Sequence, residues 1–199
     1  MLGSMSPVGD RSRNQRWWIT ATAYTVASVA AGALTGAVLG AAGQALVGIV
    51  RVPAAMRLLV LGAILIAAAA LDAGARGRLP TWRRQVDERW LTTYRGWVYG
   101  AGFGAQLGTG VATIVTSAAT YATLAAAFLS TSWRGGLLVG VVFGVARAMP
   151  LLFMARVRSV DRLYAVTRRV AAGGQRAHRL TVAGQGVLGA VVLATALSA

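Results

Sequence analysis

The sequence contains no cysteine and no lysine, and it has only five acidic residues and one histidine. Without cysteine, disulfide bonds, thiolate metal ligands and dithiol redox chemistry are excluded. The single histidine, His178, cannot form the His/Cys cluster that a zinc site needs, and no two acidic residues form a pair within an apolar segment. We therefore expect no catalytic residues, no metal and no cofactor.

Charged residues are scarce, and most of them are positive. Charged residues make up 13% of the 199 residues, whereas hydrophobic residues make up 56% and the mean hydropathy is +0.61. These values exceed what one soluble core requires and predict a membrane protein. The net charge of +15 comes from arginines that lie between apolar segments, where the positive-inside rule accounts for them. We therefore expect no nucleic acid partner.

Several apolar segments are long enough to cross a bilayer, because about 20 helical residues span a hydrocarbon core of about 30 Å. The first is too long for the apolar part of a cleaved signal peptide. We expect an all-α polytopic transmembrane helix bundle in one membrane domain, residues 17–199, after a cytoplasmic tail, residues 1–16. The expected spans, about five in number, are residues 17–50, 54–71, 96–133, 135–155 and 180–199.

The arginines alternate between the connections. Three precede the first span, six lie between the second and third, and seven lie between the fourth and fifth, whereas the other two connections hold only Arg51, Arg57 and Arg134. The positive-inside rule then places the N-terminus in the cytoplasm and the C-terminus outside. We expect a multi-pass protein of the plasma membrane.

Both arginine-rich connections, residues 79–95 and 156–176, show helical amphipathicity. We expect amphipathic cytoplasmic loops that contact anionic lipid headgroups, with protein docking as the alternative. The paired Gly173 and Gly174 predict that the amphipathic helix of the second connection ends there. The residues that carry the two patterns are Trp82, Val86, Trp90 and Tyr94, and then Val157, Val160 and Tyr164.

The first and third segments are longer than a bilayer requires. A straight helix from Trp97 to Trp133 would exceed about 50 Å at a rise of ~1.5 Å per residue, so this segment is a long tilted helix or a broken one. Gly108 and Gly110 are the expected break points there, and Gly43 is the corresponding point in the first segment. Broken helices at mid-membrane depth build the substrate sites of many transporters.

Glycines recur every four residues in three of the segments, and small residues at this spacing let helix backbones approach closely. A compact bundle is therefore expected. Residues 17–71 and 96–155 also share one order of features: a long apolar segment, a short loop that contains arginine, and a shorter apolar segment. This order indicates either an internal duplication or chance similarity in a chain rich in Ala and Gly. The glycines are Gly32, Gly36 and Gly40, then Gly96 to Gly108, then Gly136, Gly140 and Gly144.

Arg147 is the strongest candidate for a binding residue. It shares a helix face with Gly140 and Gly144, and an intramembrane arginine usually faces the bundle or a wet cavity, paired with a carboxylate or an anionic ligand. Asp72 is a candidate counter-ion. The alternative is an arginine that snorkels to the cytoplasmic surface, and Pro150 would loosen the helix nearby.

Uncharged polar residues complete the candidate substrate-binding site. Gln106 and Gln44 each lie deep in a long segment, where an amide needs several partners. Thr109 and Thr113 belong to a threonine stripe on one side of the third segment. Such a stripe suits a solute path or hydrogen bonds between helices. The candidate substrate-binding residues are Gln106, Thr109, Thr113, Arg147 and Gln44.

Residues 96–157, through GAGFGAQLGTG and GLLVGVVFGVARAMP, resemble the CcdA/DsbD-like membrane domain and the LysE-type small exporters. Those families generally have six or more spans, and the CcdA/DsbD branch carries reactive cysteines. This chain has five apparent spans and no cysteine, so no functional residue is carried over. The resemblance implies an exporter of a small solute or ion.

Two functions therefore compete. One is a secondary transporter or exporter of a small anionic or polar solute or an ion, with its site on the third and fourth spans. The other is a non-transporting membrane subunit or assembly partner, in a homo-oligomer or with other membrane subunits. Arg147 and the segment lengths favour the first, whereas the unpaired fifth span favours the second because it removes two-fold symmetry.

Overall fold

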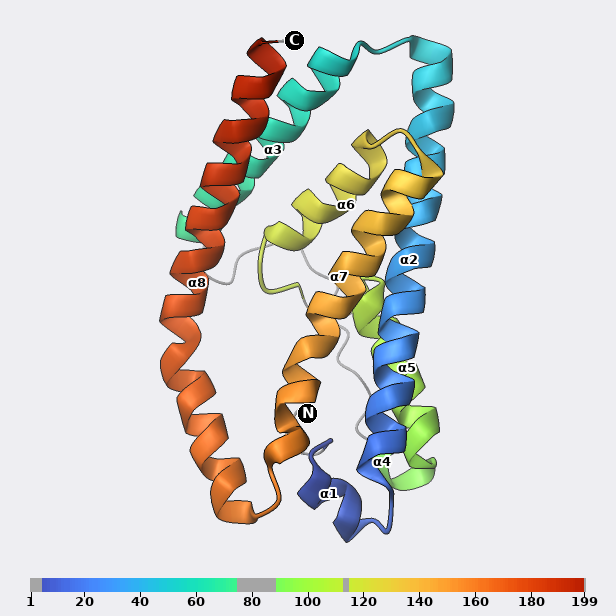
Figure 1. The fold of residues 1–199 in the computed structure, drawn as a ribbon, viewed down its shortest axis with the longest axis vertical. Coiled ribbons are helices and arrows are strands. Elements are labelled where there is room, and N and C mark those ends of the chain that lie inside the picture. Colours follow the sequence, from blue (N-terminus) through green and yellow to red (C-terminus); the bar gives the residue numbers. More distant parts are fainter. Residues whose placement is uncertain (1–4, 75–88, 113–114, 199) are drawn as a thin grey trace. The chain divides into compact units, whose positions relative to one another are not determined.

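A computed structural model describes residues 5–74, 89–112 and 115–198, and no strand occurs among them. The predicted all-α class is confirmed. The elements, in chain order, are α1 (Pro7–Ser12), α2 (Trp17–Val50), α3 (Ala54–Gly74), α4 (Trp90–Thr93), α5 (Gly96–Gly108), α6 (Ala119–Leu129), α7 (Trp133–Phe153), the 3-10 turn η1 (Met154–Arg156) and α8 (Val160–Leu197) (Figure 1).

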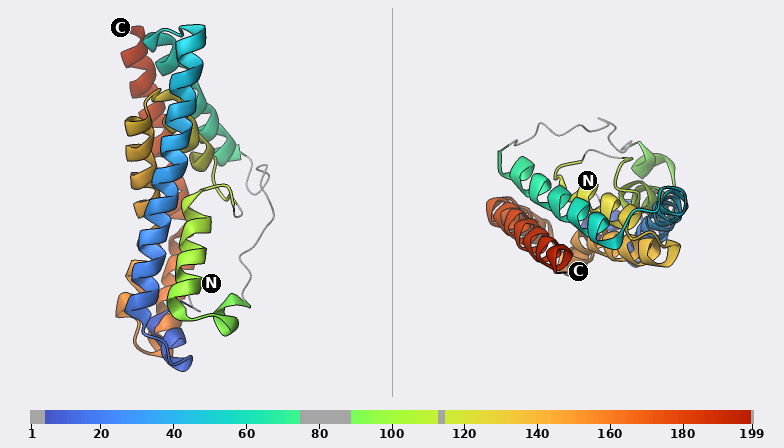
Figure 2. Two further views of the ribbon diagram at one scale, coloured as in Figure 1. Left: turned by 90° about the vertical axis from the view of Figure 1, so that its right-hand side faces the viewer. Right: turned by 90° about the horizontal axis from the view of Figure 1, so that it is seen from above.

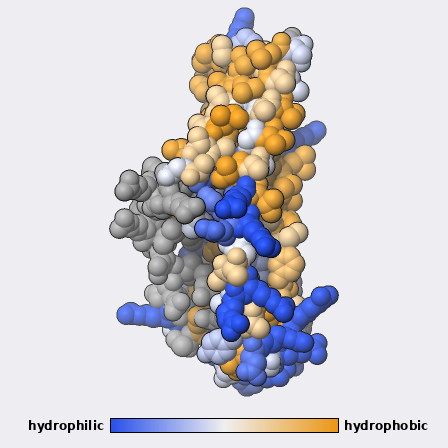
Figure 3. Space-filling view, turned by 90° about the vertical axis from the view of Figure 1, so that its left-hand side faces the viewer, coloured by the Kyte–Doolittle hydropathy of each residue, from blue (hydrophilic) through white to orange (hydrophobic). Residues whose placement is uncertain are grey.

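Four of these helices are long and apolar enough to cross a membrane, namely α2, α3, α7 with η1, and α8, and α6 is a shorter apolar helix. Only 17% of the most apolar window of α2 is buried within the protein. Its remaining hydrophobic side chains need an apolar solvent, which the bilayer supplies. Figure 3 views the molecule from the α8 side and shows broad hydrophobic surface beside hydrophilic side chains. The protein is an integral, multi-pass membrane protein of about five spans.

The third segment is broken, which decides between the two predicted alternatives. α5 ends at Gly108, and α6 begins at Ala119. Gly110 has a φ of 78°, in the left-handed region that glycine adopts without a Cβ clash. The Thr109 hydroxyl donates to the Gln106 carbonyl at 2.8 Å and accepts from the Ala112 amide at 3.4 Å, so it replaces helical partners at the break.

The first segment is not broken, although Gly43 was a predicted break point. α2 continues through Gly43 to Val50. A Cβ atom at Gly43 would overlap the backbone carbonyl of Phe128, which belongs to α6. This glycine permits close helix packing, and a continuous helix keeps every backbone hydrogen bond of the segment.

The stop predicted at Gly173 and Gly174 is wrong. α8 runs without interruption from Val160 to Leu197, so the second predicted loop is largely the first half of a helix. Each glycine costs about 1 kcal/mol in a helix relative to alanine, but neither removes a backbone hydrogen bond. The neighbouring alanines, Ala171, Ala172 and Ala177, favour continuation. At ~1.5 Å per residue, the 38 residues of α8 make a helix longer than the bilayer core is thick.

Most of the first predicted loop, residues 79–95, lies outside the described residues.

The predicted N-terminal tail is partly folded onto the helices. Ser6 caps α1, because its side chain accepts a hydrogen bond from the Gly9 amide at 3.2 Å, and Pro7 occupies the first helical position. Met5 and Asp10 are buried, with exposed fractions of 1% and 0%. The composition of residues 1–16 did not predict this packing, because the buried residues are few and some of them are polar.

The helices form two compact units. The first comprises residues 1–32, 82–114 and 141–174, and the second comprises residues 33–81, 115–140 and 175–199. In the first unit α5 lies beside the N-terminal part of α2 (Figure 2). In the second unit α3 packs on α6, with a core that includes Leu65 and Ala122.

The absence of native cysteine permits a direct test of the predicted orientation. Ser159 precedes α8 and Ser198 follows it, and both are exposed. With single cysteines at these positions, a membrane-impermeant maleimide applied to intact cells is expected to label Ser198→Cys at once and Ser159→Cys only after lysis. External labelling of Ser159→Cys would contradict the five-span, N-in and C-out topology.

Candidate functional site

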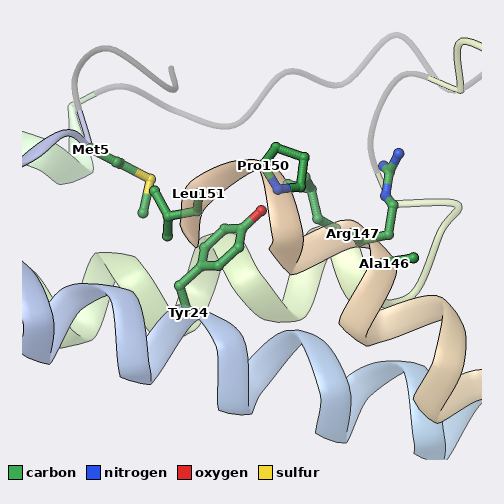
Figure 4. A pocket seen from close by; sticks show the side chains of 7 residues that line it. Met5, Tyr24, Ala146, Arg147, Pro150 and Leu151 are labelled. Carbon is green, nitrogen blue, oxygen red and sulfur yellow. The ribbon is translucent and has the colours of Figure 1, made fainter. Parts of the chain in front are cut away.

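A cavity of about 310 Å³ lies in the first unit, between α2, α5, α7 and the N-terminal segment. Its two polar side chains are Tyr24 and Arg147. In Figure 4, Tyr24 rises from α2 with its hydroxyl toward Pro150, and Arg147 stands on α7 on the other side of Pro150. The lining residues are Met5, Tyr24, Leu107, Ala146, Arg147, Pro150 and Leu151.

Arg147 is the charged residue in the lining of this mostly apolar cavity, and in Figure 4 its side chain extends away from Tyr24. Its side chain is half-buried, and its buried Nε has no hydrogen-bond partner among the residues that the structure describes. The guanidinium carbon lies 5.8 Å from the centre of the Phe143 ring, one turn earlier on α7, which gives a cation–π contact. Within the described ranges the ion pair is that of Arg13 with Asp10, so Arg147 has no carboxylate partner there. Among the described residues, the cation of this cavity has no carboxylate partner.

Pro150 adds an acceptor near this cation. It lies inside α7 and has no N–H, so it cannot donate to the carbonyl of Ala146 four residues earlier. Ala146 lines the same cavity as Arg147. The site thus combines guanidinium donors, a phenolic hydroxyl and a backbone acceptor within an apolar wall, which suits a small molecule with an anionic group.

The structure places the other predicted site residues differently. Gln106 and Thr109 lie at the end of α5 in the first unit and are partly buried, but neither is among the residues that line the cavity. Thr113 lies outside the described residues. Gln44 is exposed on the part of α2 that belongs to the second unit. Of the four candidates that the structure describes, Arg147 is the one that lines the cavity.

Sequence reasoning missed Tyr24. A signal was present, since Thr20, Tyr24 and Ser28 are spaced by four residues and give α2 a polar stripe. The backbones of these three residues face Gly100, Gly104 and Gly108 of α5, and a Cβ at any of the three glycines would meet them. Ser28 also donates to the Gly144 carbonyl of α7 at 3.0 Å. This stripe holds α2 between α5 and α7 and so positions Tyr24.

A buried polar cluster fixes the N-terminal wall of the cavity. Asp10 Oδ1 accepts hydrogen bonds from the Tyr99 hydroxyl at 2.6 Å and from Arg13 Nη2 at 2.7 Å. Trp17 Nε1 donates to the Met5 carbonyl at 2.8 Å. These contacts hold α1 against α2 and α5, and they place Met5 at the cavity.

Asp72, expected as a counter-ion of Arg147, has other partners. Its carboxylate accepts hydrogen bonds from the Ser117 hydroxyl, the Ala118 amide and the Gln185 side chain, all within the second unit. None of these partners is an arginine. The site of Arg147 is therefore built without the acid that the sequence suggested.

No family model, curated protein or solved structure matches this chain. The resemblance to CcdA/DsbD-like domains and LysE-type exporters stays a prediction. The assignment of function therefore depends on the chemistry of the cavity around Arg147.

Proposed function

We propose that this protein is a plasma-membrane secondary transporter or exporter that binds a small anionic solute at Arg147. The observation that supports this function is a half-buried guanidinium, without a carboxylate partner among the described residues, at the wall of an apolar cavity. A charge in this environment is costly unless a counter-charge joins it. An anion entering the cavity supplies that counter-charge.

The form of the cavity agrees with a small solute. Its volume of about 310 Å³ is at the lower end of the range for small-molecule sites, ~300–1,000 Å³. Met5, Leu107 and Leu151 give the wall an apolar lining, and an apolar surrounding strengthens the attraction between the guanidinium and an anion. The Tyr24 hydroxyl supplies a neutral hydrogen-bonding group at the wall of the same cavity.

The broken third segment is a second feature that suits transport. α5 ends and α6 begins within one apolar segment, and such interrupted helices leave backbone groups available where transporters bind their solutes.

Anionic lipid headgroups at the arginine-rich first half of α8 would orient the protein in the membrane. These arginines include Arg162, Arg169 and Arg176, which are exposed.

Replacement of Arg147 tests the function. Arg147→Lys keeps the charge but loses the planar fork, so we expect at least about a tenfold loss of anion affinity with the fold retained. Arg147→Ala should abolish binding. Binding is measured as thermal stabilisation of purified protein by acetate, lactate and inorganic phosphate, and the anion that binds is then tested for uptake into proteoliposomes.

Arg134 provides a matched control on the same helix. It lies in the first turn of α7, is exposed, and contacts the Trp133 ring at 5.3 Å from guanidinium carbon to ring centre. Arg134→Ala should leave anion binding unchanged. Equal stabilisation of wild-type and Arg147→Ala proteins, or none of either, would favour the non-transporting subunit or assembly partner.

A further inference from the structure

Another cavity of the first unit, also of about 310 Å³, lies where α2 and α5 begin. Its lining differs from that of the Arg147 cavity, because two arginines and three uncharged polar residues form most of it. Every lining residue lies within three positions of the first residue of α2 or of α5. The lining includes Gln15, Arg16 and Thr20 on the α2 side, and Arg95, Gly96 and Trp97 on the α5 side.

Two helix N-termini meet at this cavity. A Cβ at Gly100 would meet Thr20 and one at Gly108 would meet Ser28, so α5 and α2 run in the same direction along their contact. Figure 2 shows the two helices starting side by side. The first amides of a helix have no acceptor within it, and the helix dipole adds positive potential at that end. Two such ends side by side favour an anion.

The arginines of the cavity add two positive charges to these helix ends. The side chains of Arg16 and Arg95 are exposed. In the described part of the chain the ion pair is that of Arg13 with Asp10, so neither Arg16 nor Arg95 has a carboxylate partner there. The guanidinium groups and the helix ends therefore combine into one region of positive potential.

A buried hydroxyl at the same cavity is unused. Thr20 lines the cavity with an exposed fraction of 1%, and its Oγ1 makes no hydrogen bond to a described residue. This atom lies beside the first residue of α5, where a Cβ at Gly96 would overlap it. The hydroxyl of Tyr99 lies nearby, but its hydrogen is donated to Asp10 at 2.6 Å. Buried polar atoms without a partner are rare, and an acceptor in the cavity would supply one.

We propose that this cavity binds the phosphate group of an anionic phospholipid. A phosphate supplies the negative charge that the two arginines and the two helix ends attract. Its oxygens accept hydrogen bonds from guanidinium groups, backbone amides and hydroxyls, which are the donors that Arg16, Arg95, Thr20 and the helix ends present. The planar fork of arginine matches two phosphate oxygens at once.

The position of the cavity favours a lipid over free phosphate as the source of this group. α2 is long and apolar enough to cross the membrane, and the cavity lies at its first turn. Trp97 at the cavity and Trp18 on α2 have exposed fractions of 54% and 60%, and tryptophan is enriched where a bilayer meets water. A headgroup at this level reaches the cavity while its acyl chains stay in the bilayer.

Lipid titration of the purified full-length protein in detergent tests the site. The dissociation constant of dioctanoyl phosphatidylglycerol is obtained from the rise of the unfolding midpoint with its concentration. Arg16→Ala combined with Arg95→Ala should weaken binding at least about tenfold. Arg11→Ala is the matched control, because it removes an exposed arginine of α1 that does not line the cavity. It should leave the dissociation constant unchanged.

Thr20→Val separates a built site from general attraction to basic residues, because it changes neither size nor charge. We expect about a tenfold loss of affinity for phosphatidylglycerol, since one hydrogen bond to a charged group is removed. Without lipid, its unfolding midpoint should equal or exceed that of the wild type, because a buried hydroxyl without a partner is removed. A lower midpoint without lipid would show that the hydroxyl serves the fold, and would overturn its role in the site.

Two further ligands distinguish the sources of phosphate. Inorganic phosphate lacks acyl chains, and dioctanoyl phosphatidylcholine carries a cation that offsets its phosphate, so both should bind at least about tenfold more weakly than phosphatidylglycerol. Inorganic phosphate that binds as tightly as the lipid would overturn the lipid assignment. Equal losses in Arg11→Ala and in the double variant would overturn the site itself, since the whole basic surface would then attract the lipid.

The phospholipid site does not depend on the proposed transport function. Arg147 does not line this cavity, so Arg147→Ala should bind phosphatidylglycerol as the wild type does. Failure of solute binding at Arg147 and failure of lipid binding at Arg16 and Arg95 are therefore separate outcomes.

Discussion

Gly104→Ala is expected to destabilise the protein by about 3 kcal/mol, and Gly104→Leu to prevent recovery of a monodisperse folded protein. A Cβ at Gly104 would overlap the Tyr24 carbonyl oxygen and lie 2.9 Å from the Tyr24 Cα, so the backbones of α5 and α2 must separate. Overpacking of this kind costs about 1–3 kcal/mol, at the upper limit when the backbone must move. The measurement is thermal unfolding in detergent, where the midpoint should fall by about 6–12 °C.

Gly184 is the matched control. It lies in α8, and nothing occupies the space within 4 Å of its added Cβ. Gly184→Ala should keep or raise stability, because alanine is favoured over glycine in a helix by about 1 kcal/mol. Equal unfolding midpoints for Gly104→Ala and Gly184→Ala would show that α5 does not pack on α2 as described.

The long helices could be predicted from the sequence because a bilayer imposes one requirement on every span. A segment in lipid must satisfy its own backbone hydrogen bonds, so apolar length translates directly into helices such as α2, α3 and α7. The excess length of the third segment likewise predicted a break or a tilt. The choice between them depended on the Thr109 hydroxyl and on the φ of Gly110, which are local details of the chain at the break.

Glycine shows where prediction from the sequence fails. Gly110 lies in a break, Gly43 packs against Phe128 inside a continuous helix, and Gly174 lies in a helix with open space around it. The residue type is the same in all three cases. The backbone that faces each glycine decides its role, and that backbone is distant in sequence.

Some residues of the candidate site could likewise be predicted from the sequence, and others could not. Arg147 could be found because a charge within an apolar segment is rare and needs a reason. Tyr24 and Met5 could not, since an aromatic or apolar residue in or near a span is ordinary. The partners of Asp72 are 45 and 113 residues away in the sequence, at Ser117 and Gln185, and no periodicity links them.

Asp10→Ala is expected to release the N-terminal segment from the cavity. Asp10 is fully buried, and it accepts from both Arg13 and Tyr99. Its removal deprives Arg13 of the ion pair and Tyr99 of its acceptor, and breaking a buried pair in this way costs about 3–5 kcal/mol. Met5, which the cluster holds at the cavity wall, should then become accessible to solvent.

A single cysteine measures this release, because the chain has no other. In the Met5→Cys background, Asp10→Ala should raise the rate of maleimide labelling at least about a hundredfold, since about 3 kcal/mol corresponds to more than two powers of ten in the population of the open form. The control is Asp161→Ala, which removes an exposed acid from the first turn of α8 and should leave the rate unchanged. Similar labelling rates in all three proteins would show that the contact between Asp10 and Tyr99 does not hold the N-terminal segment in place.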